Sequence, residues 1–261
     1  MANSERGRSA QYSAPMGRTA AGAIDEGLRA YMLGVYNYMA IGLAITGVAA
    51  LLIANLAVTS DPSQAVAQFA NGVMLTSLGS AIYASPLKWV VMLAPLGMLF
   101  YLSARLNTMS VGSAQMAFWA FAALMGLSLS SIFLIYTSES IVRVFFITSA
   151  SFGALSLFGY TTKKDISGWG SFLFMGLIGI IIAALVNLFL QSSAMQFAIS
   201  VIGVLVFAGL TAYDTQQIKE MYYEGDDSTV AGRKSISGAL RLYLDFINMF
   251  LMLLHLFGNR E

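Results

Sequence analysis

Two aspartates lie inside the last two long apolar runs of this chain, where a charged side chain is costly. Asp214 lies near the end of the run 195–218, and Asp245 lies well inside the run 236–257. A carboxylate at the centre of a bilayer costs roughly 2.5 kcal/mol or more on insertion scales. Each aspartate therefore needs either a partner or a function.

The two aspartates are placed almost symmetrically about Val230, in the segment that joins the two runs. If the runs form an antiparallel helical hairpin, both carboxyl groups lie at about the same depth. Burial and a nearby like charge both disfavour ionisation, so such a pair can share one proton and titrates as a unit. A shared proton would hold the helices together at low pH, whereas two charges would repel at higher pH. The spacing therefore predicts a pH sensor or an ion gate.

Calcium is the cation that two carboxylates suit best. Calcium takes six to eight oxygen ligands, and Asp214 and Asp245 supply at most four. Water and amide or carbonyl oxygens would have to supply the others. We therefore expect a weak, transient calcium site, with calcium as a permeating ion and no bound cofactor.

Other polar residues of the last two runs share a helix face with the aspartates. In the last run, the spacings of four, three, four and three place five residues on one face: Arg241, Asp245, Asn248, Met252 and His255. In the preceding run, one side carries Ser200, Gly203, Thr211, Asp214 and Gln217. Polar stripes of this kind face a bundle interior or a water-filled cavity. We therefore expect Asn248, Thr211, Gln217 and His255 to face a pore.

Simpler interpretations of the same residues stay open. Arg241 and Asp245 could form a plain ion pair at the cytoplasmic entrance, and Asp214 could reach the interface and stay hydrated. Arg105 could compensate the charge of the aspartates, or it could anchor the end of its helix. The acidic cluster at 224–227 could attract cations or simply form a soluble turn.

The composition is that of an integral membrane protein. Of 261 residues, 57% are hydrophobic and only 10% are charged, and the mean hydropathy is +0.72. A soluble domain carries about 25% charged residues. The net charge of +1 indicates no strongly charged partner such as a nucleic acid, and the absence of cysteine excludes disulfides and thiolate chemistry.

Seven apolar runs are long enough to cross a bilayer as helices, which need about 20 residues. They cover 33–58, 84–104, 112–136, 141–160, 171–190, 195–218 and 236–257. The segment 59–83 is expected to be a loop with an interfacial part. We expect an all-α membrane protein with a polar, disordered cytoplasmic tail over residues 1–30 and one seven-helix transmembrane domain over residues 31–261.

The orientation follows from the lysines and arginines of the short loops, which favour the cytoplasmic side. A cytoplasmic N-terminus places eleven of these residues inside and only Lys88, Arg143 and Arg260 outside. Seven spans then place the C-terminus outside. If the last helix re-enters instead of crossing, the C-terminus returns to the cytoplasm.

Two segments around the aspartates resemble the Bax inhibitor-1 family, also called the transmembrane Bax inhibitor motif family. The run Gly-Leu-Thr-Ala-Tyr-Asp-Thr-Gln-Gln-Ile-Lys over 209–219 resembles its signature, and Leu-Tyr-Leu-Asp-Phe-Ile-Asn over 242–248 resembles its last helix. The resemblance implies seven helices with the last one central, and a pH-sensitive calcium leak sensed by Asp214 and Asp245. It also implies a basal arginine in the second helix, for which Arg105 is the nearest candidate. Bacterial-type members would place the chain in the inner (plasma) membrane.

Two other classes of function are compatible with the sequence. The resemblance also allows a non-enzymatic regulator that binds another membrane protein, such as a membrane-anchored AAA protease. Paired aspartates occur in intramembrane aspartyl proteases, where acid catalysis by such a pair is chemically reasonable. Those enzymes carry a Gly-Xaa-Gly-Asp context, whereas Asp214 follows Leu-Thr-Ala-Tyr and Asp245 follows Arg-Leu-Tyr-Leu. We therefore predict that the chain is not an enzyme.

Overall fold

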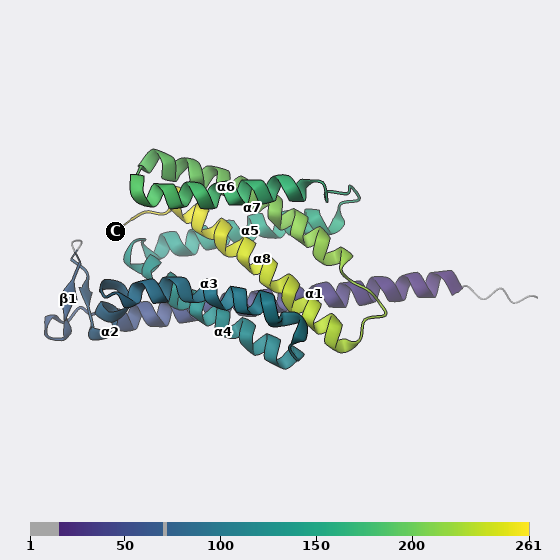
Figure 1. Ribbon diagram of the computed structural model, residues 1–261, viewed down its shortest axis with the longest axis horizontal. Coiled ribbons are helices and arrows are strands. Elements are labelled where there is room, and N and C mark those ends of the chain that lie inside the picture. Colours follow the sequence, from purple (N-terminus) through teal and green to yellow (C-terminus); the bar gives the residue numbers. More distant parts are fainter. Residues whose placement is uncertain (1–15, 70–71, 261) are drawn as a thin grey trace, which may run out of the picture.

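The computed structural model describes residues 16–69 and 72–260 and is almost entirely helical (Figure 1). The long helices are α1 (Met16–Ala57), α3 (Leu87–Arg105), α4 (Val111–Leu129), α5 (Ser138–Thr161), α6 (Trp169–Leu190), α7 (Ser193–Glu220) and α8 (Ser228–Phe257). Short 3-10 turns continue two of them, η3 (Leu106–Thr108) after α3 and η4 (Ser130–Leu134) after α4. Seven helices of the described chain are long and apolar enough to cross a membrane, which confirms the predicted number of spans.

The first helix begins earlier than the sequence interpretation placed it. Helix α1 starts at Met16, so residues 16–30 are helical, although the polar tail was expected to extend to residue 30. The segment is rich in alanine and has no proline after Pro15, so its backbone favours a helix even where its side chains are polar. The rest of the predicted tail, residues 1–15, lies outside the described residues.

The segment between α1 and α3 is a small folded cap. It holds η1 (Pro62–Gln64), the strands β1 (Ala67–Gln68) and β2 (Met74–Leu75), α2 (Ser77–Gly79) and the π-turn η2 (Ser80–Ala84). The strands pair antiparallel, with Ala67 opposite Leu75 and Gln68 opposite Met74. Gly72 has a φ of +89°, a conformation that side chains disfavour, and this allows the hairpin to turn.

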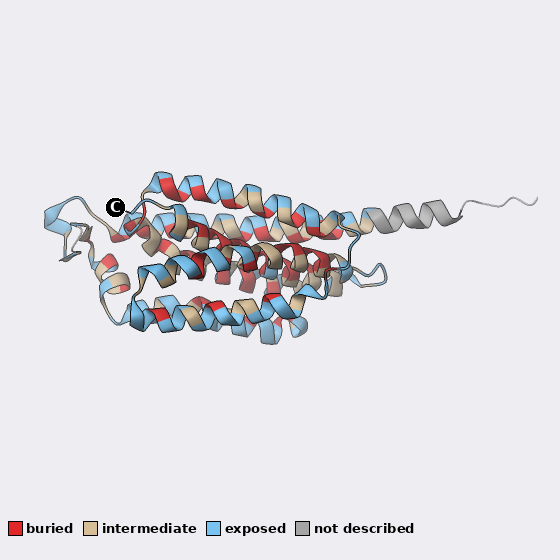
Figure 2. Ribbon diagram, turned by 90° about the horizontal axis from the view of Figure 1, so that it is seen from above, coloured by how far each residue is buried: buried red, intermediate tan, exposed pale blue. Residues whose placement is uncertain are grey.

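Helix α8 is the most buried of the candidate spans. Of its most apolar stretch, 56% of the residues are buried, against at most 39% for any other span. Its main neighbours are α1, α4, α5 and α7, while α3 packs on α4 and α6 packs on α7. In Figure 2 the buried residues gather along the middle of the bundle. The family resemblance implied a last helix surrounded by six others, whereas here four long helices are its principal neighbours.

The core around α8 is largely aromatic. Tyr243 is fully buried, and its ring packs edge-on against Phe118 at 5.9 Å and Phe121 at 5.4 Å between centroids. On the other side, Phe246 packs against Phe152 of α5 at 5.5 Å. Edge-to-face packing of aromatic rings adds specificity to the burial of their surface. These contacts fix α8 between α4 and α5.

Helix α8 crosses the whole bundle. It starts next to the α7–α8 loop and ends beside the connection between α4 and α5, where Asn259 O accepts a hydrogen bond from Thr137 N at 3.0 Å. Tyr136 and Arg260 also pair in a β-bridge at this end. The structure thus has a crossing last helix and not the re-entrant alternative. We call the end that carries the α7–α8 loop the inner end, and the end that carries the C-terminus the outer end.

Candidate functional site: an aspartate pair between the last two helices

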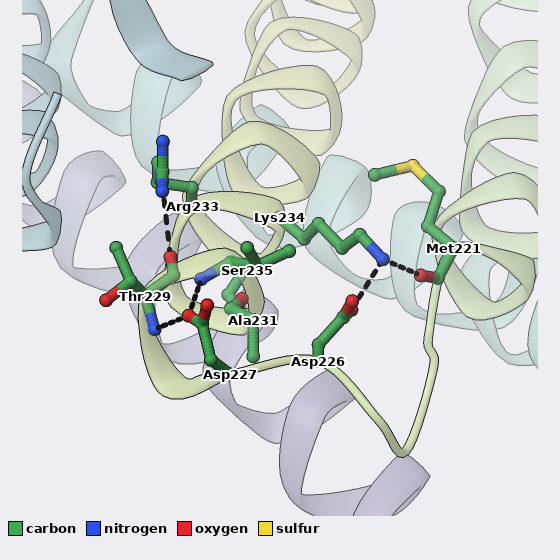
Figure 3. Close-up of polar contacts among 9 residues, drawn as sticks. Met221, Asp226, Asp227, Thr229, Ala231, Arg233, Lys234 and Ser235 are labelled. Carbon is green, nitrogen blue, oxygen red and sulfur yellow. Dashed lines mark hydrogen bonds and ion pairs between the residues drawn. The ribbon is translucent and has the colours of Figure 1, made fainter. Parts of the chain in front are cut away.

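The loop that joins α7 and α8 fixes how the two helices meet (Figure 3). The Lys234 ammonium group donates to the backbone carbonyl of Met221 at 2.9 Å and forms an ion pair with Asp226. Since Met221 immediately follows α7 and Lys234 lies in the second turn of α8, this side chain ties the two helix ends together.

The neighbouring acid starts the last helix. Asp227 is the N-cap of α8, and its Oδ1 accepts hydrogen bonds from Thr229 N at 2.7 Å and Val230 N at 2.8 Å. The backbone N–H groups of Val230 and Thr229 lower the pKa of Asp227 because they stabilise its charged form. Asp226 and Asp227 therefore make their ion pair and hydrogen bonds within the turn itself. This favours the interpretation of the acidic cluster as a turn over a cation-attracting mouth.

Asp214 and Asp245 face one another across the α7–α8 interface. Their carboxyl groups lie within range of direct hydrogen bonding. Asp245 is buried, with 5% of its surface exposed, and the Asp214 side chain is 16% exposed. The Oδ2 atom of Asp245 has no hydrogen-bond partner among the described residues. The structure therefore brings together the two acids that the sequence singled out, with one buried oxygen unsatisfied.

Arg241 lies one turn before Asp245 on α8 but approaches the other aspartate. Its Nη1 atom is 3.9 Å from Asp214 Oδ1, and half of its side chain is exposed. The contact is an ion pair at the limit of the usual distance, with no hydrogen bond between the two groups. The simple pair that the sequence suggested between Arg241 and Asp245 thus takes the form of a contact with Asp214.

The other candidate site residues are more dispersed. The Thr211 hydroxyl is buried and donates to Phe207 O at 2.7 Å, and the Asn248 amide donates to Leu244 O at 2.8 Å, both one turn back along their own helices. Gln217 donates to Glu220 Oε2 at 3.1 Å near the inner end.

His255 and Arg105 lie away from the aspartates. The exposed His255 ring contacts Leu251 O at 2.7 Å and lies near the outer end. The Arg105 side chain is exposed at the end of α3 and makes no ion pair with any residue that the structure describes.

One structural residue of this region was not singled out by the sequence. Gln216 is buried, accepts a hydrogen bond from Ile166 N at 2.9 Å and donates to Lys164 O at 2.8 Å. Its amide thereby holds the α5–α6 connection against α7. Helical spacing shows only that Gln216, two positions after Asp214, lies on a different face of α7, and it gives no sign of these contacts.

Two hydroxyl clusters flank the aspartate pair. Tyr36 OH lies 2.7 Å from the Ser156 hydroxyl, which lies 3.0 Å from the Thr215 hydroxyl, so the cluster links α1, α5 and α7. The Thr46 hydroxyl lies 2.6 Å from Tyr243 OH and 2.9 Å from Ala122 O, which links α1, α4 and α8. Sequence periodicity alone gives no sign of these links, because they join residues far apart in the chain.

The geometry of the aspartate pair suits proton sharing better than metal storage. No group of three or more histidine, cysteine or acidic residues that could hold a metal lies within the described chain. Two carboxylates alone leave most of the coordination shell of calcium to water and backbone oxygens. Two carboxylates at close range, by contrast, need only one proton to lower their combined charge from two negative charges to one and to form a hydrogen bond between them.

Comparison with known proteins places this arrangement among membrane proteins of bacteria. The family model described as "Inhibitor of apoptosis-promoting Bax1" matches residues 28–261. The chain is 48% identical to the uncharacterized protein RP147 of Rickettsia prowazekii, over 91% of this chain and 92% of that protein. It is 47% identical to the inner membrane protein YbhL of Escherichia coli K12, over 90% of this chain and 94% of that protein. A Caulobacter vibrioides protein is 44% identical, over 92% of each chain.

Proposed function

Since this chain belongs to the Bax inhibitor-1 family and is an inner-membrane protein of seven helices, we propose that it is a pH-sensitive cation leak. In this proposal, a proton shared between Asp214 and Asp245 controls the passage of calcium. The observation that supports it most directly is the contact between the buried carboxyl group of Asp245, which has an unsatisfied oxygen, and the partly buried carboxyl group of Asp214.

The proton changes how strongly α7 and α8 attract one another. With one proton, the two carboxyl groups form a hydrogen bond that joins the helices in a region of low dielectric constant. Without it, two charges repel at close range, and water or a cation must enter to screen them. The pair is therefore an element with two states whose balance depends on pH.

Few other charged groups can compensate the pair. Arg241 is the nearest cation, on α8 itself. From α1, Tyr31 is buried and interacts electrostatically with Arg241, while Tyr36 is hydrogen-bonded to Ser156. Helix α4 carries no titratable residue, and on α5 the nearest one is Tyr160, whose carbonyl accepts from Lys219. The protonation of the pair should therefore dominate the electrostatics of this interface.

Calcium suits the deprotonated state of the pair. Its two carboxylates attract a divalent cation, and their small number keeps the affinity low enough for release. A conducting site must bind an ion weakly enough to let it leave. No catalytic role is proposed for either aspartate.

The proposal is tested by calcium flux into dye-loaded liposomes that contain the purified chain, scanned from about pH 5 to 8. Wild type should show a flux that changes with pH. Asp214→Asn and Asp245→Asn should each show a pH-independent flux at the level that wild type has at its acidic end, because the amide mimics a protonated carboxyl group.

Two outcomes would contradict the leak. A normal pH response in both variants would remove the aspartate pair from the sensor. A flux no greater than that of empty liposomes at every pH would favour the alternative of a non-enzymatic regulator that binds another membrane protein, such as a membrane-anchored AAA protease. In that case the aspartates would serve to join two helices.

A further inference from the structure

Helices α7 and α8 pack against one another along the bundle, not only at the aspartates. Towards the outer end, Gly203 of α7 meets Met252 of α8: a Cβ atom on this glycine would lie 2.9 Å from both Cγ and Sδ of Met252. The methionine side chain therefore lies directly against the backbone of α7. On α8, Met252 is two turns beyond Asp245, which is about 10 Å along the helix axis.

Beyond this contact, the same two helices line a polar pocket of about 460 Å³ that opens at the outer end. Ser200 of α7 and His255 of α8 lie in its wall, each one turn beyond the Gly203–Met252 contact. The rest of the lining includes Asn187, which is buried, together with the partly buried Gln196 and the exposed Arg260. Eight of its nine lining residues have polar side chains, so water is the expected occupant of the pocket.

The outer residues of this pocket are held in place by one buried ring. His255 packs edge-on against Tyr136 at 6.3 Å between centroids, and the Arg260 guanidinium lies 5.8 Å from the centre of the same ring. Tyr136 is only 4% exposed. The pocket is thus a formed part of the outer end, lined mainly from α6, α7 and α8, and Tyr136 of the α4–α5 connection supports two of its lining residues.

We propose that Met252, seated against Gly203, is the apolar seal between the aspartate pair and this outer pocket. It lies between the aspartate pair and the pocket along a single interface, and the three heavy atoms nearest to a Cβ atom at position 203 all belong to Met252. The role of this seal as a gate for ions rests on the proposed leak. Its role as a barrier to water can be tested without any measurement of ion flux.

The residue types suit such a seal. Methionine is unbranched and has three rotatable bonds, so it can leave a notch without moving the backbone. Glycine provides the notch, since any side chain at position 203 would displace the methionine. Apolar constrictions close ion pathways by excluding water, and they open when they widen or become polar. A small separation of α7 from α8 at the aspartates would free the thioether.

The absence of cysteine from the chain makes a direct test possible. Single cysteines are introduced as His255→Cys in the exposed wall of the outer pocket, Asn248→Cys between the seal and the aspartates, and Tyr223→Cys in the exposed α7–α8 loop. Each is treated with a membrane-impermeant thiol reagent from one side of the membrane at a time. Tyr223→Cys reports which side is the inner one.

The seal predicts a specific pattern of labelling. From the outer side, His255→Cys should react and Asn248→Cys should not. Adding Met252→Ala should raise the outer labelling of Asn248→Cys by an order of magnitude, and the isosteric Met252→Gln should do the same by hydrating the contact. Met249→Ala is the matched control, because Met249 is buried on another face of the same helix and should leave Asn248→Cys protected.

The outcomes that overturn the seal differ from those that overturn the leak. Outer labelling of Asn248→Cys in the presence of Met252, or equal protection with and without Met252 in folded protein, would show that this side chain is not the barrier. If the labelling follows the predicted pattern but the liposomes show no flux, the seal stands and the leak does not. If wild type conducts, Met252→Ala should conduct more at every pH.

Discussion

The hydroxyl clusters and the aspartate pair lie at comparable depth in the same bundle, but their hydrogen bonding differs. In the Thr46–Tyr243 cluster, each hydroxyl has a hydrogen-bond partner within 3.0 Å. In the Tyr36–Ser156–Thr215 cluster, the series of hydrogen bonds ends at the backbone carbonyl of Thr211, which accepts from the Thr215 hydroxyl. In the aspartate pair, Asp245 keeps a buried oxygen without a partner, and the nearest cation is 3.9 Å from the other carboxyl group.

This difference separates polar groups that stabilise the bundle from polar groups suited to a switch. A satisfied hydroxyl cluster changes little between pH 5 and 8, because serine and threonine do not titrate, tyrosine ordinarily titrates only at about 10, and each hydrogen bond is already made. An incompletely satisfied acid pair changes its charge and its hydrogen bonding with one proton. Burial alone does not identify a functional polar residue; what matters is whether its hydrogen bonds are complete.

The largest expected effect is on the pH dependence of calcium flux, and it should differ between substitutions at two neighbouring residues of α8. Asp245→Asn should reduce the ratio of calcium flux between pH 5 and pH 8 to about one, since the shared proton is gone. Tyr243→Phe, two positions away, should keep the pH profile of wild type because its hydroxyl belongs to the satisfied cluster. Flux into dye-loaded liposomes measures both, and a flat profile for Tyr243→Phe would break the distinction between the clusters.

The same two substitutions should have opposite effects on stability. Tyr243→Phe should lower the free energy of unfolding by ~1 kcal/mol, because it removes a buried hydrogen bond to Thr46. Asp245→Asn should be neutral or stabilising at neutral pH, since a buried amide costs less than a buried carboxylate with an unsatisfied oxygen. Reversible denaturant unfolding in detergent compares them, and a strong destabilisation by Asp245→Asn would mean that the acid mainly supports the fold.

A smaller effect is expected from Arg241, the one cation among the described residues that pairs with an aspartate of the site. Arg241→Gln should move the midpoint of the pH response upward without abolishing it, because the arginine favours the charged form of the pair. Arg105→Gln is the control, since its exposed side chain makes no ion pair within the described residues. A shift caused by Arg105→Gln, and none by Arg241→Gln, would restore Arg105 as the counter-charge.

The smallest effect concerns the acid at the start of α8. The backbone N–H groups lower the pKa of Asp227, so its stabilising contribution is present above the ordinary aspartate pKa. That contribution is lost as the pH falls through the lowered value. Asp227→Asn, which still caps the helix, should therefore remove a small acid-dependent loss of stability. Thermal unfolding between pH 3 and 6 measures it, and an unchanged acid dependence would exclude this residue.

The sequence predicted the fold well because long apolar runs determine it almost alone. Seven spans follow from hydropathy, and the contact between Asp214 and Asp245 follows from their placement about the α7–α8 loop. The helical extension over residues 16–30 was missed because side-chain polarity was used where backbone propensity decides. The hairpin after α1 is too short for a periodic pattern to predict it.

The finer parts of the site depend on contacts that no periodicity contains. Helical spacing placed Met252 and His255 on the same face as Asp245, but it could not show that Gly203 receives the methionine. Nor could it show that Arg241 approaches Asp214 in place of Asp245, since this depends on how α7 and α8 cross. The buried role of Gln216 depends on the position of the α5–α6 connection, which local sequence does not determine.

The most direct test of the account is a double-mutant cycle on the pH dependence of calcium flux, using Asp214→Asn, Asp245→Asn and the double variant. If one shared proton controls the leak, each single variant already loses the whole response, and the double variant behaves like either single variant. Single variants that each lose only part of the response, with losses that add in the double variant, would show two independent carboxyl groups and contradict the shared proton.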